Sequence, residues 1–224
     1  AGGIITHAIL VSVFVTVIGT ALSVTATVAM GYALSRPTVL GRPVLLVALF
    51  TLFFVPGIIP NYLMVKQLGL LNNYASLILP VLMNAFNLVV VRQFFMSIPQ
   101  ELIDSARMDG AGDLRILFRI VLPLSKAIVA VISLFYAVAY WNDFFRALLY
   151  LSDHAMWPLQ LVLRLYVIQS APLASAASLA GEQLPPQQAM QMAVVAIATV
   201  PILLVYPFLQ KYFTVGVLRG AIKG

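Results

Sequence analysis

A charged segment near the middle of the chain, residues 97–126, constrains the fold more than any other feature. Charged residues make up 9% of the 224 residues, yet seven of them fall between Glu101 and Arg119. Apolar runs lie on both sides, long enough to cross a bilayer, which takes about 20 residues. An ionisable side chain costs roughly 2–3 kcal/mol or more in hydrocarbon. We therefore expect this segment to be a loop in water between two membrane-spanning helices.

The composition of the chain as a whole is that of a membrane protein. Hydrophobic residues make up 62% of the sequence and the mean hydropathy is +1.02, whereas a soluble domain is about half apolar and about a quarter charged. The fold class that this predicts is an all-α, polytopic helical bundle. Without cysteine, neither a disulfide framework nor a thiolate metal site is possible, and no metal ligands are predicted. The basic residues are spread over several loops, which argues against nucleic-acid binding.

Five membrane-spanning helices are predicted from the apolar runs. They cover residues 4–34, 44–60, 74–95, 127–151 and 189–208. The first is rich in small and β-branched residues, which favour close helix packing in lipid, and the second is broken at Pro56-Gly57. Residues 152–188 form the longest polar connection, in which 157–169 are expected to lie in the interface as a helix. Residues 210–224 form a short basic tail.

The distribution of lysine and arginine predicts the orientation. If residues 97–126 are cytoplasmic, ten basic residues lie inside and three lie outside, which agrees with the positive-inside rule. Residues 152–188 are then extracytoplasmic, the tail 210–224 is cytoplasmic, and the amino terminus of this stretch is outside.

The charged segment also has a predicted structure of its own. Ser97, followed three residues later by Gln100, reads as a capping box for a short helix that ends near Met108. Gly110 suits the left-handed residue that terminates such a helix, and Asp113 is expected to cap a second helix. The segment is therefore predicted to be a helix-turn-helix outside the membrane.

The same residues resemble the signature of the membrane subunits of binding-protein-dependent ABC importers. That signature is Glu-Ala-Ala, three residues, Gly, nine residues, Ile, one residue and Leu-Pro. Here it stands as Asp104-Ser105-Ala106, Gly110, Ile120 and Leu122-Pro123. Asp104 replaces the family's Glu and Ser105 its first Ala, and both keep the character of the residue. The residues around the motif are similar to those of the carbohydrate-uptake branch, which includes the maltose permease G subunit and permeases for larger oligosaccharides. Some of these oligosaccharides are uronate polymers such as alginate or pectin fragments.

The resemblance implies one permease domain over residues 1–224 in a bacterial inner membrane. Family members of this type have six spans with both ends inside, so a first span is expected to be missing from these residues. The implied partners are a second homologous permease subunit, two cytoplasmic ATPase subunits and an extracytoplasmic solute-binding protein, besides membrane lipid. This chain is then not an enzyme and binds no cofactor, because ATP and Mg belong to the ATPase.

In the family, the loop transmits the closure of the ATPase subunits to the permease. The residues that the resemblance assigns to this coupling are Glu101, Asp104, Ser105, Ala106, Asp109, Gly110, Ala111, Ile120, Leu122 and Pro123. Asp104 is expected to pair with a basic group of the ATPase, and residues 216–224 resemble a tail that reaches between the ATPase subunits. The implied function is ATP-driven import of a sugar or oligosaccharide by alternating access.

Two other functions stay open at this point. An ion-coupled secondary transporter needs ionisable groups near the bilayer midplane, but the central parts of the predicted spans have none. The chain also has no P-loop for ATP, so its energy has to come from a partner. A permease of the same family for a non-sugar solute is the other alternative.

Polar and aromatic residues within the third and fourth predicted spans are candidates for the substrate path. They are Asn84, Asn87, Tyr136, Tyr140, Trp141 and Asn142. The competing interpretation is structural, because the asparagines can bond a neighbouring helix and the aromatic residues can form an interfacial belt. Asp143 and Arg146 either pair with each other, or Arg146 attracts an acidic substrate.

Overall fold

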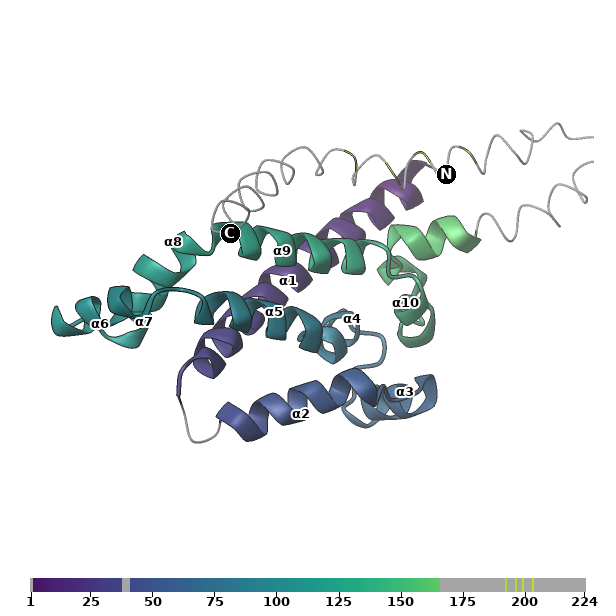
Figure 1. Ribbon diagram of the computed structural model, residues 1–224. Helices are drawn as coiled ribbons and strands as arrows, with labels where there is room; N and C mark the ends of the chain where they lie inside the picture. The colour runs from purple at the N-terminus through teal and green to yellow at the C-terminus, as the bar shows by residue number, and fades with distance from the viewer. Residues whose placement is uncertain are drawn as a thin grey trace, which may run out of the picture.

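The computed structural model describes residues 2–37 and 41–165, together with the isolated positions 192, 196, 199 and 203. Helices account for the regular structure of these residues, and no strand occurs among them. The predicted fifth span (189–208) and most of the connection 152–188 lie outside the described residues, and the tail 210–224 lies there entirely. Figure 1 shows the elements as an elongated helical arrangement.

Helix α1 (Gly2–Ser35) confirms the first predicted span. Its 34 residues contain no charged side chain, and among the described residues it is the one unbroken helix long and apolar enough to cross a membrane. Two bent pairs also pass this test if each pair is counted as one span. They are Ala75–Val81 with Ala85–Met96, bent by 53°, and Asp113–Leu124 with Lys126–Trp141, bent by 84°.

The second and third predicted spans are each broken in the structure. Helix α2 (Gly41–Phe53) is followed by α3 (Ile58–Gln67), and the predicted break at Pro56-Gly57 falls between them. The third region contains α4 (Ala75–Ile78), the 3₁₀ turn η1 (Leu79–Val81) and α5 (Ala85–Met96). Asn84 begins α5 as its N-cap, because its side chain accepts a hydrogen bond from the Asn87 N–H.

The charged segment forms α6 (Gln100–Met108) and α7 (Asp113–Ile116), and a π-helical stretch, η2 (Leu117–Val121), connects α7 to α8 (Leu122–Leu124). Helix α9 (Lys126–Trp141) then turns back into the bundle.

The predicted fourth span, 127–151, is wrong at its carboxyl end. Helix α9 stops ten residues earlier, at Trp141, and α10 (Phe145–Tyr150) follows after a short break. The break has two polar causes. Asn142 donates its side-chain amide to the Val138 carbonyl, and the Asp143 carboxylate accepts from the Arg146 backbone N–H at the start of α10. Beyond α10 lie the 3₁₀ turn η3 (His154–Met156) and a helical stretch over 159–165, within the helix predicted for 157–169.

Helix α1 packs along both α5 and α9, and these three helices form the centre of the molecule (Figure 1). Two glycines allow the close approach. A Cβ atom at Gly19 would lie 2.9 Å from the Tyr140 ring, and one at Gly31 would lie 2.9 Å from Val91 Cγ1. Small residues at such contacts let helix backbones approach closely, which is the usual basis of helix association in lipid.

Two buried hydroxyl pairs connect α1 to α9. Ser23 Oγ and Tyr140 Oη are 2.8 Å apart, and Thr27 Oγ1 and Tyr136 Oη are also 2.8 Å apart. The Tyr136 hydroxyl in addition accepts the backbone N–H of Asn84 at 3.0 Å. Tyr136 thus bonds α1 and the beginning of α5 at the same time.

We predict that Tyr136→Phe lowers the free energy of unfolding by about 1–3 kcal/mol, because it leaves the Asn84 N–H and the Thr27 hydroxyl without their buried partner. Thermal unfolding of the purified protein in detergent measures the change. Tyr62→Phe is the matched control, since the Tyr62 ring stacks on Tyr150 and is half-buried; we expect it to change stability by less than about 0.5 kcal/mol. Equal effects of the two substitutions would contradict the prediction.

Candidate functional site

Two regions of the molecule carry the residues that the sequence singles out, and they lie at different places in the bundle. Helices α6 and α7 project at one end of the molecule, whereas α10 lies near the other (Figure 1). A cavity lies between these ends, against α5 and α9.

The turn between α6 and α7 is built around Gly110. Its φ is +76°, as predicted for a left-handed cap. The Gly110 N–H donates to the Arg107 carbonyl and the Ala111 N–H donates to the Ala106 carbonyl, both at 2.9 Å. These two bonds are the Schellman pattern, which satisfies the last carbonyls of a helix. The backbone of the turn is therefore fixed by hydrogen bonds.

Both predicted amino-terminal caps are wrong in detail. The Ser97 hydroxyl donates backwards to the Phe94 carbonyl at 2.7 Å, and Pro99 occupies the N-cap position of α6. Gly112 occupies the N-cap position of α7, and Asp113 is its first residue. Neither proline nor glycine has a side-chain oxygen that could accept from the first N–H groups of the helix, so no side-chain cap is made. An acidic residue in the first turn still interacts favourably with the helix dipole.

Helix α6 is held by one apolar side chain and presents a polar face. Ile103 is 2% exposed and belongs to the main core, whereas Met108 is 84% exposed. Six of the ten loop residues assigned from the family signature are exposed, namely Glu101, Asp104, Ser105, Asp109, Gly110 and Pro123. The other four are half-buried, namely Ala106, Ala111, Ile120 and Leu122. The exposed acidic groups are accessible to another protein.

Within the chain, the Asp104 carboxylate is bonded to a neutral partner. Gln100 Nε2 donates to its Oδ1 at 3.1 Å. Arg107, one of three arginines in the charged segment, is used elsewhere, because its Nη2 lies 3.4 Å from Asp113 Oδ1 across the turn. Both members of that ion pair are exposed, so it contributes at most about 1 kcal/mol to stability. Asp104 thus keeps its negative charge available at the surface.

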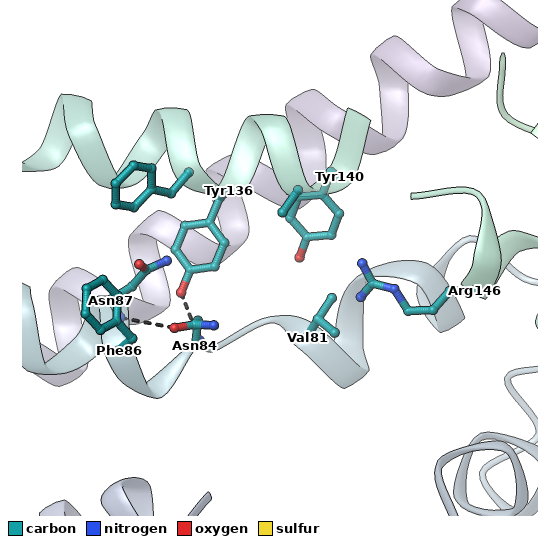
Figure 2. A pocket seen from close by; sticks show the side chains of 9 residues that line it. Val81, Asn84, Phe86, Asn87, Tyr136, Tyr140 and Arg146 are labelled. Carbon is teal, nitrogen blue, oxygen red and sulfur yellow. Dashed lines mark hydrogen bonds between the residues drawn. The ribbon is translucent and has the colours of Figure 1, made fainter. Parts of the chain in front are cut away.

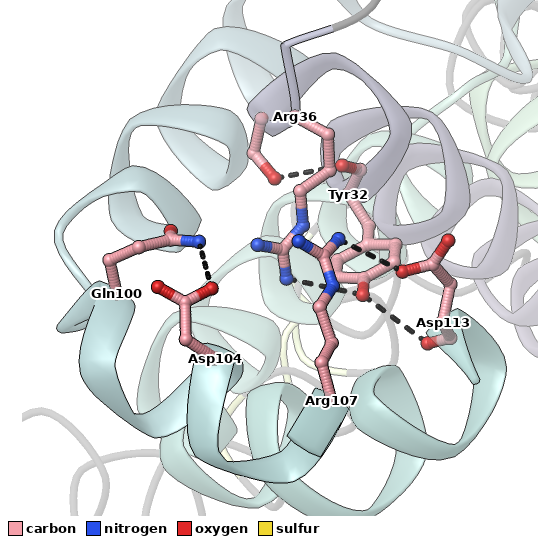
Figure 3. A network of polar contacts seen from close by, with 7 residues as sticks. Tyr32, Arg36, Gln100, Asp104, Arg107 and Asp113 are labelled. Carbon is pink, nitrogen blue, oxygen red and sulfur yellow. Dashed lines mark hydrogen bonds and ion pairs between the residues drawn. The ribbon is translucent and has the colours of Figure 1, made fainter. Parts of the chain in front are cut away.

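A polar contact ties the end of α1 to the loop, and sequence reasoning missed it (Figure 3). The Tyr32 hydroxyl donates to the Asp113 carbonyl at 3.3 Å, and Arg36 Nη2 donates to the same hydroxyl at 3.2 Å. The Arg36 guanidinium also lies 4.8 Å from the centre of the Tyr32 ring. Tyr32 and Asp113 are 81 residues apart, so local sequence patterns hold no signal for this contact.

The second region is a cavity of about 340 Å³ between the broken α4–α5 segment and α9 (Figure 2). Its lining combines amide, phenol, guanidinium and apolar groups. The residues are Val81, Asn84, Phe86, Asn87, Phe135, Tyr136, Ala139, Tyr140 and Arg146. Volumes of about 300–1,000 Å³ are typical of small-molecule sites, so the cavity is large enough to hold part of a solute.

The structure brings together four of the six residues predicted for the substrate path. Asn84, Asn87, Tyr136 and Tyr140 line the cavity. Two others lie elsewhere. Trp141 is buried in a separate cluster with Ala8, Leu159, Val162 and Leu163, and Asn142 is exposed.

The interfacial-belt interpretation is wrong for three aromatic residues of α9. Tyr136, Tyr140 and Trp141 are all buried inside the protein, and the hydroxyls of the two tyrosines bond side chains of α1. The predicted bond from the Asn84 side chain to a neighbouring helix is not seen among the described residues, because its Oδ1 accepts from the Asn87 N–H and caps its own helix. These residues therefore shape the cavity wall, and whether they contact a solute stays a prediction.

Comparison with known proteins identifies the class of protein to which this fold belongs. The chain is a permease, and its family is shown by the sequence profile described as "Binding-protein-dependent transport system inner membrane component", which matches residues 10–219. The chain belongs to this family, and its place is the inner membrane. Its fold and predicted motif agree with this assignment.

Three similar proteins are informative. The polygalacturonan/rhamnogalacturonan transport system permease protein YtcP of Bacillus subtilis (strain 168) is 52% identical over 223 residues, which cover 99% of this chain and 78% of that protein. Protein LplC of the same organism is 49% identical over 215 residues, covering 96% and 73%. Among solved structures, a bacterial ABC transporter involved in the import of the acidic polysaccharide alginate matches with a TM-score of 0.84 and 33% identity. That match covers 94% of this chain and 75% of the other.

We predict that Gly110→Val destabilises the α6–α7 turn by about 1–2 kcal/mol, because a non-glycine residue at positive φ is strained. A Cβ atom there would meet nothing within 4 Å, so the cost comes from the backbone alone. Gly110→Asn should be tolerated better, since asparagine visits this conformation. Hydrogen–deuterium exchange of residues 100–108 measures the effect.

The control is Gly112→Ala, two residues along the chain. Gly112 has φ −72° and ψ 163°, and its Cβ position is equally open. We expect its exchange rates to match those of the wild type. We expect faster exchange in Gly110→Val, and exchange no faster than in the wild type would show that the turn does not need glycine.

Proposed function

We propose that this chain is the transmembrane subunit of an ATP-driven importer that carries acidic oligosaccharides across the inner membrane. The family supports the transport role. The sugar class is supported by two relatives, the polygalacturonan/rhamnogalacturonan permease YtcP and the ABC transporter involved in the import of alginate. All three of these polymers contain uronate sugars, so the proposed substrate carries carboxylates.

The observation that carries the coupling role is the geometry of α6. It is a short helix at one end of the bundle, with Ile103 buried beneath it and its acidic face exposed. We infer that this face binds a cytoplasmic ATPase subunit, with Asp104 paired to a basic group there. Because Gln100 is its neutral partner in this chain, Asp104 can exchange that contact for an ion pair with a basic group, in which both partners are charged.

The proposed cycle needs a stiff connection between this loop and the membrane helices. Tyr32 of α1 donates a hydrogen bond to the Asp113 carbonyl of the loop, and the Schellman turn fixes α6 against α7. When two ATPase subunits close on ATP, movement of α6 is then passed to the bundle, which changes from inward-open to outward-open. The solute-binding protein delivers the oligosaccharide to the outward-open state, and hydrolysis of ATP by the partner subunits resets the cycle.

The proposed assembly also contains a second homologous permease. Helix α2 has no buried residue within Gly41–Phe53, so its apolar side chains need lipid or another chain to cover them. The proposed ATP and Mg sites lie on the ATPase subunits, and the permease supplies the passage and the coupling surface.

Purification of this chain from its native membrane in mild detergent, with mass spectrometry of the proteins that accompany it, tests the assignment. Recovery of a P-loop ATPase, a second permease and a solute-binding protein would support it, and the ligand of the binding protein would identify the substrate. Recovery of the chain alone, still active in vesicles without ATP, would favour an ion-coupled transporter instead.

We predict that Asp104→Lys lowers ATP-dependent uptake at least about tenfold, because it presents a positive charge to a basic group of the ATPase. Uptake and ATPase activity of the reconstituted complex measure the effect together, and uncoupling should reduce uptake more than ATP hydrolysis. Lys66→Glu reverses an exposed charge on α3, at the other end of the molecule, and should leave both activities unchanged. Normal uptake by Asp104→Lys would remove Asp104 from the coupling role.

A further inference from the structure

Arg146 has an unusual position at the edge of the cavity. It lies in the first turn of α10, and its Nε is 2.7 Å from Asp143 Oδ2. Its backbone N–H also donates to Asp143 Oδ1 at 3.3 Å. The two side chains are 21% and 12% exposed, so the ion pair is shielded from water. This double attachment fixes the direction in which the guanidinium points.

The guanidinium is only partly satisfied by Asp143. Its Nη1 atom is buried and has no hydrogen-bond partner among the residues that the structure describes. A guanidinium carries five N–H donors, and the contact with Asp143 is made through Nε. An unpaired buried donor is unfavourable, and a ligand that pairs with it recovers that loss. Figure 2 shows the guanidinium turned toward the cavity, on the side of Tyr140.

The lining of the cavity suits a sugar that carries one carboxylate. Arg146 is the one side chain with a full charge among the residues that line it in the described part of the chain. Asn84 and Asn87 supply amide groups that can bond hydroxyls, and the two tyrosines supply aromatic faces. The nearest acid, Asp143, is already engaged with Arg146. A ligand carboxylate at the free end of the guanidinium would form the bidentate pair that arginine favours.

The broken helix adds a second favourable contribution at the same place. Helix α5 begins at the cavity, with Asn84 as its N-cap. A helix amino terminus carries a partial positive charge, and half-helices that begin inside transporters direct this charge at anionic groups of the substrate. Arg146 and the start of α5 thus face the cavity from different segments of the chain, with the same sign of potential.

We propose that Arg146 forms a carboxylate-binding subsite in this cavity and recognises a uronate unit of the oligosaccharide as it passes. Asp143 acts as a positioning residue, because it holds Nε and leaves the other end of the guanidinium for the substrate. The proposal rests on the function proposed above and deepens it. The competing role of the pair is structural, as a fixed ion pair that starts α10.

The two roles are separated by removing the pair in two ways. Asp143→Asn removes the ion pair but keeps the guanidinium. Asp143→Asn with Arg146→Gln removes both charges together, which avoids an unpaired buried charge and is better tolerated than the loss of one partner. Arg164→Gln is the matched control, since Arg164 lies over the Phe144 ring, 4.1 Å from its centre, and does not line the cavity.

The experiment uses the complete complex in proteoliposomes, with its binding protein and ATP. The probes are trigalacturonate and its fully methyl-esterified form, which keeps the sugar backbone but has no carboxylates. The readout is the KM for uptake of each probe, expressed as the KM of the ester divided by the KM of the acid. Because the binding protein is the same in every sample, its own preference cancels when each variant is compared with the wild type.

The double variant is expected to lower the ester-to-acid ratio about tenfold or more, since it loses a charge-assisted bidentate contact. Asp143→Asn is expected to lower the ratio by a smaller factor, because the asparagine oxygen can still accept from Arg146 Nε but without the charge, and Arg164→Gln is expected to keep the wild-type ratio. If the wild type rejects the ester altogether, the double variant should raise the KM of the acid by about the same factor, and Asp143→Asn should raise it by less.

Two results would overturn the subsite. One is an unchanged ratio in the double variant, and the other is an equal loss in Asp143→Asn, which would assign the pair a structural role. Failure of the wild-type complex to take up either probe with ATP would instead overturn the proposed function, so the two failures are distinguishable.

Discussion

The contact between α1 and α9 determines where the other elements of this protein lie. It is made possible by Gly19, which lets the Tyr140 ring approach the α1 backbone, and it is completed by the buried hydroxyl pairs of Tyr136 and Tyr140. In a bilayer the hydrophobic effect does not drive helices together, so close packing and polar pairs of this kind have to do so. The position of α9 in turn sets the positions of the cavity and of the loop that precedes it.

The sequence predicted the helical class, the polar loop and the turn at Gly110, because each depends on local chemistry. Charge in an apolar chain indicates a loop, and glycine after a short helix indicates a left-handed cap. The caps at Ser97 and Asp113 were wrong by one or two residues, because the helices begin after Pro99 and Gly112, which have no side-chain acceptor.

The burial of Tyr136 and Tyr140 in α9 could not be predicted from local sequence chemistry. Their partners on α1 are 109 and 117 residues away in the sequence, and a tyrosine near the end of an apolar run fits an interface as well as a core. The early end of α9 depends similarly on Asn142 and Asp143, whose polar contacts interrupt a run that hydropathy alone would continue. The assignment of individual residues to coupling or to solute contact stays a prediction.

Helix α1 contacts both the cavity wall and the α6–α7 loop. Over 34 residues it runs without a break, which at 1.5 Å per residue is about 50 Å. Thr27 bonds Tyr136 at the wall of the cavity, and Tyr32, little more than one turn further on, bonds the loop. A single rigid rod thus joins the two. If occupancy of the cavity changes the affinity of the loop for its partner, thermodynamic reciprocity requires that binding of the partner change the affinity of the cavity by the same factor.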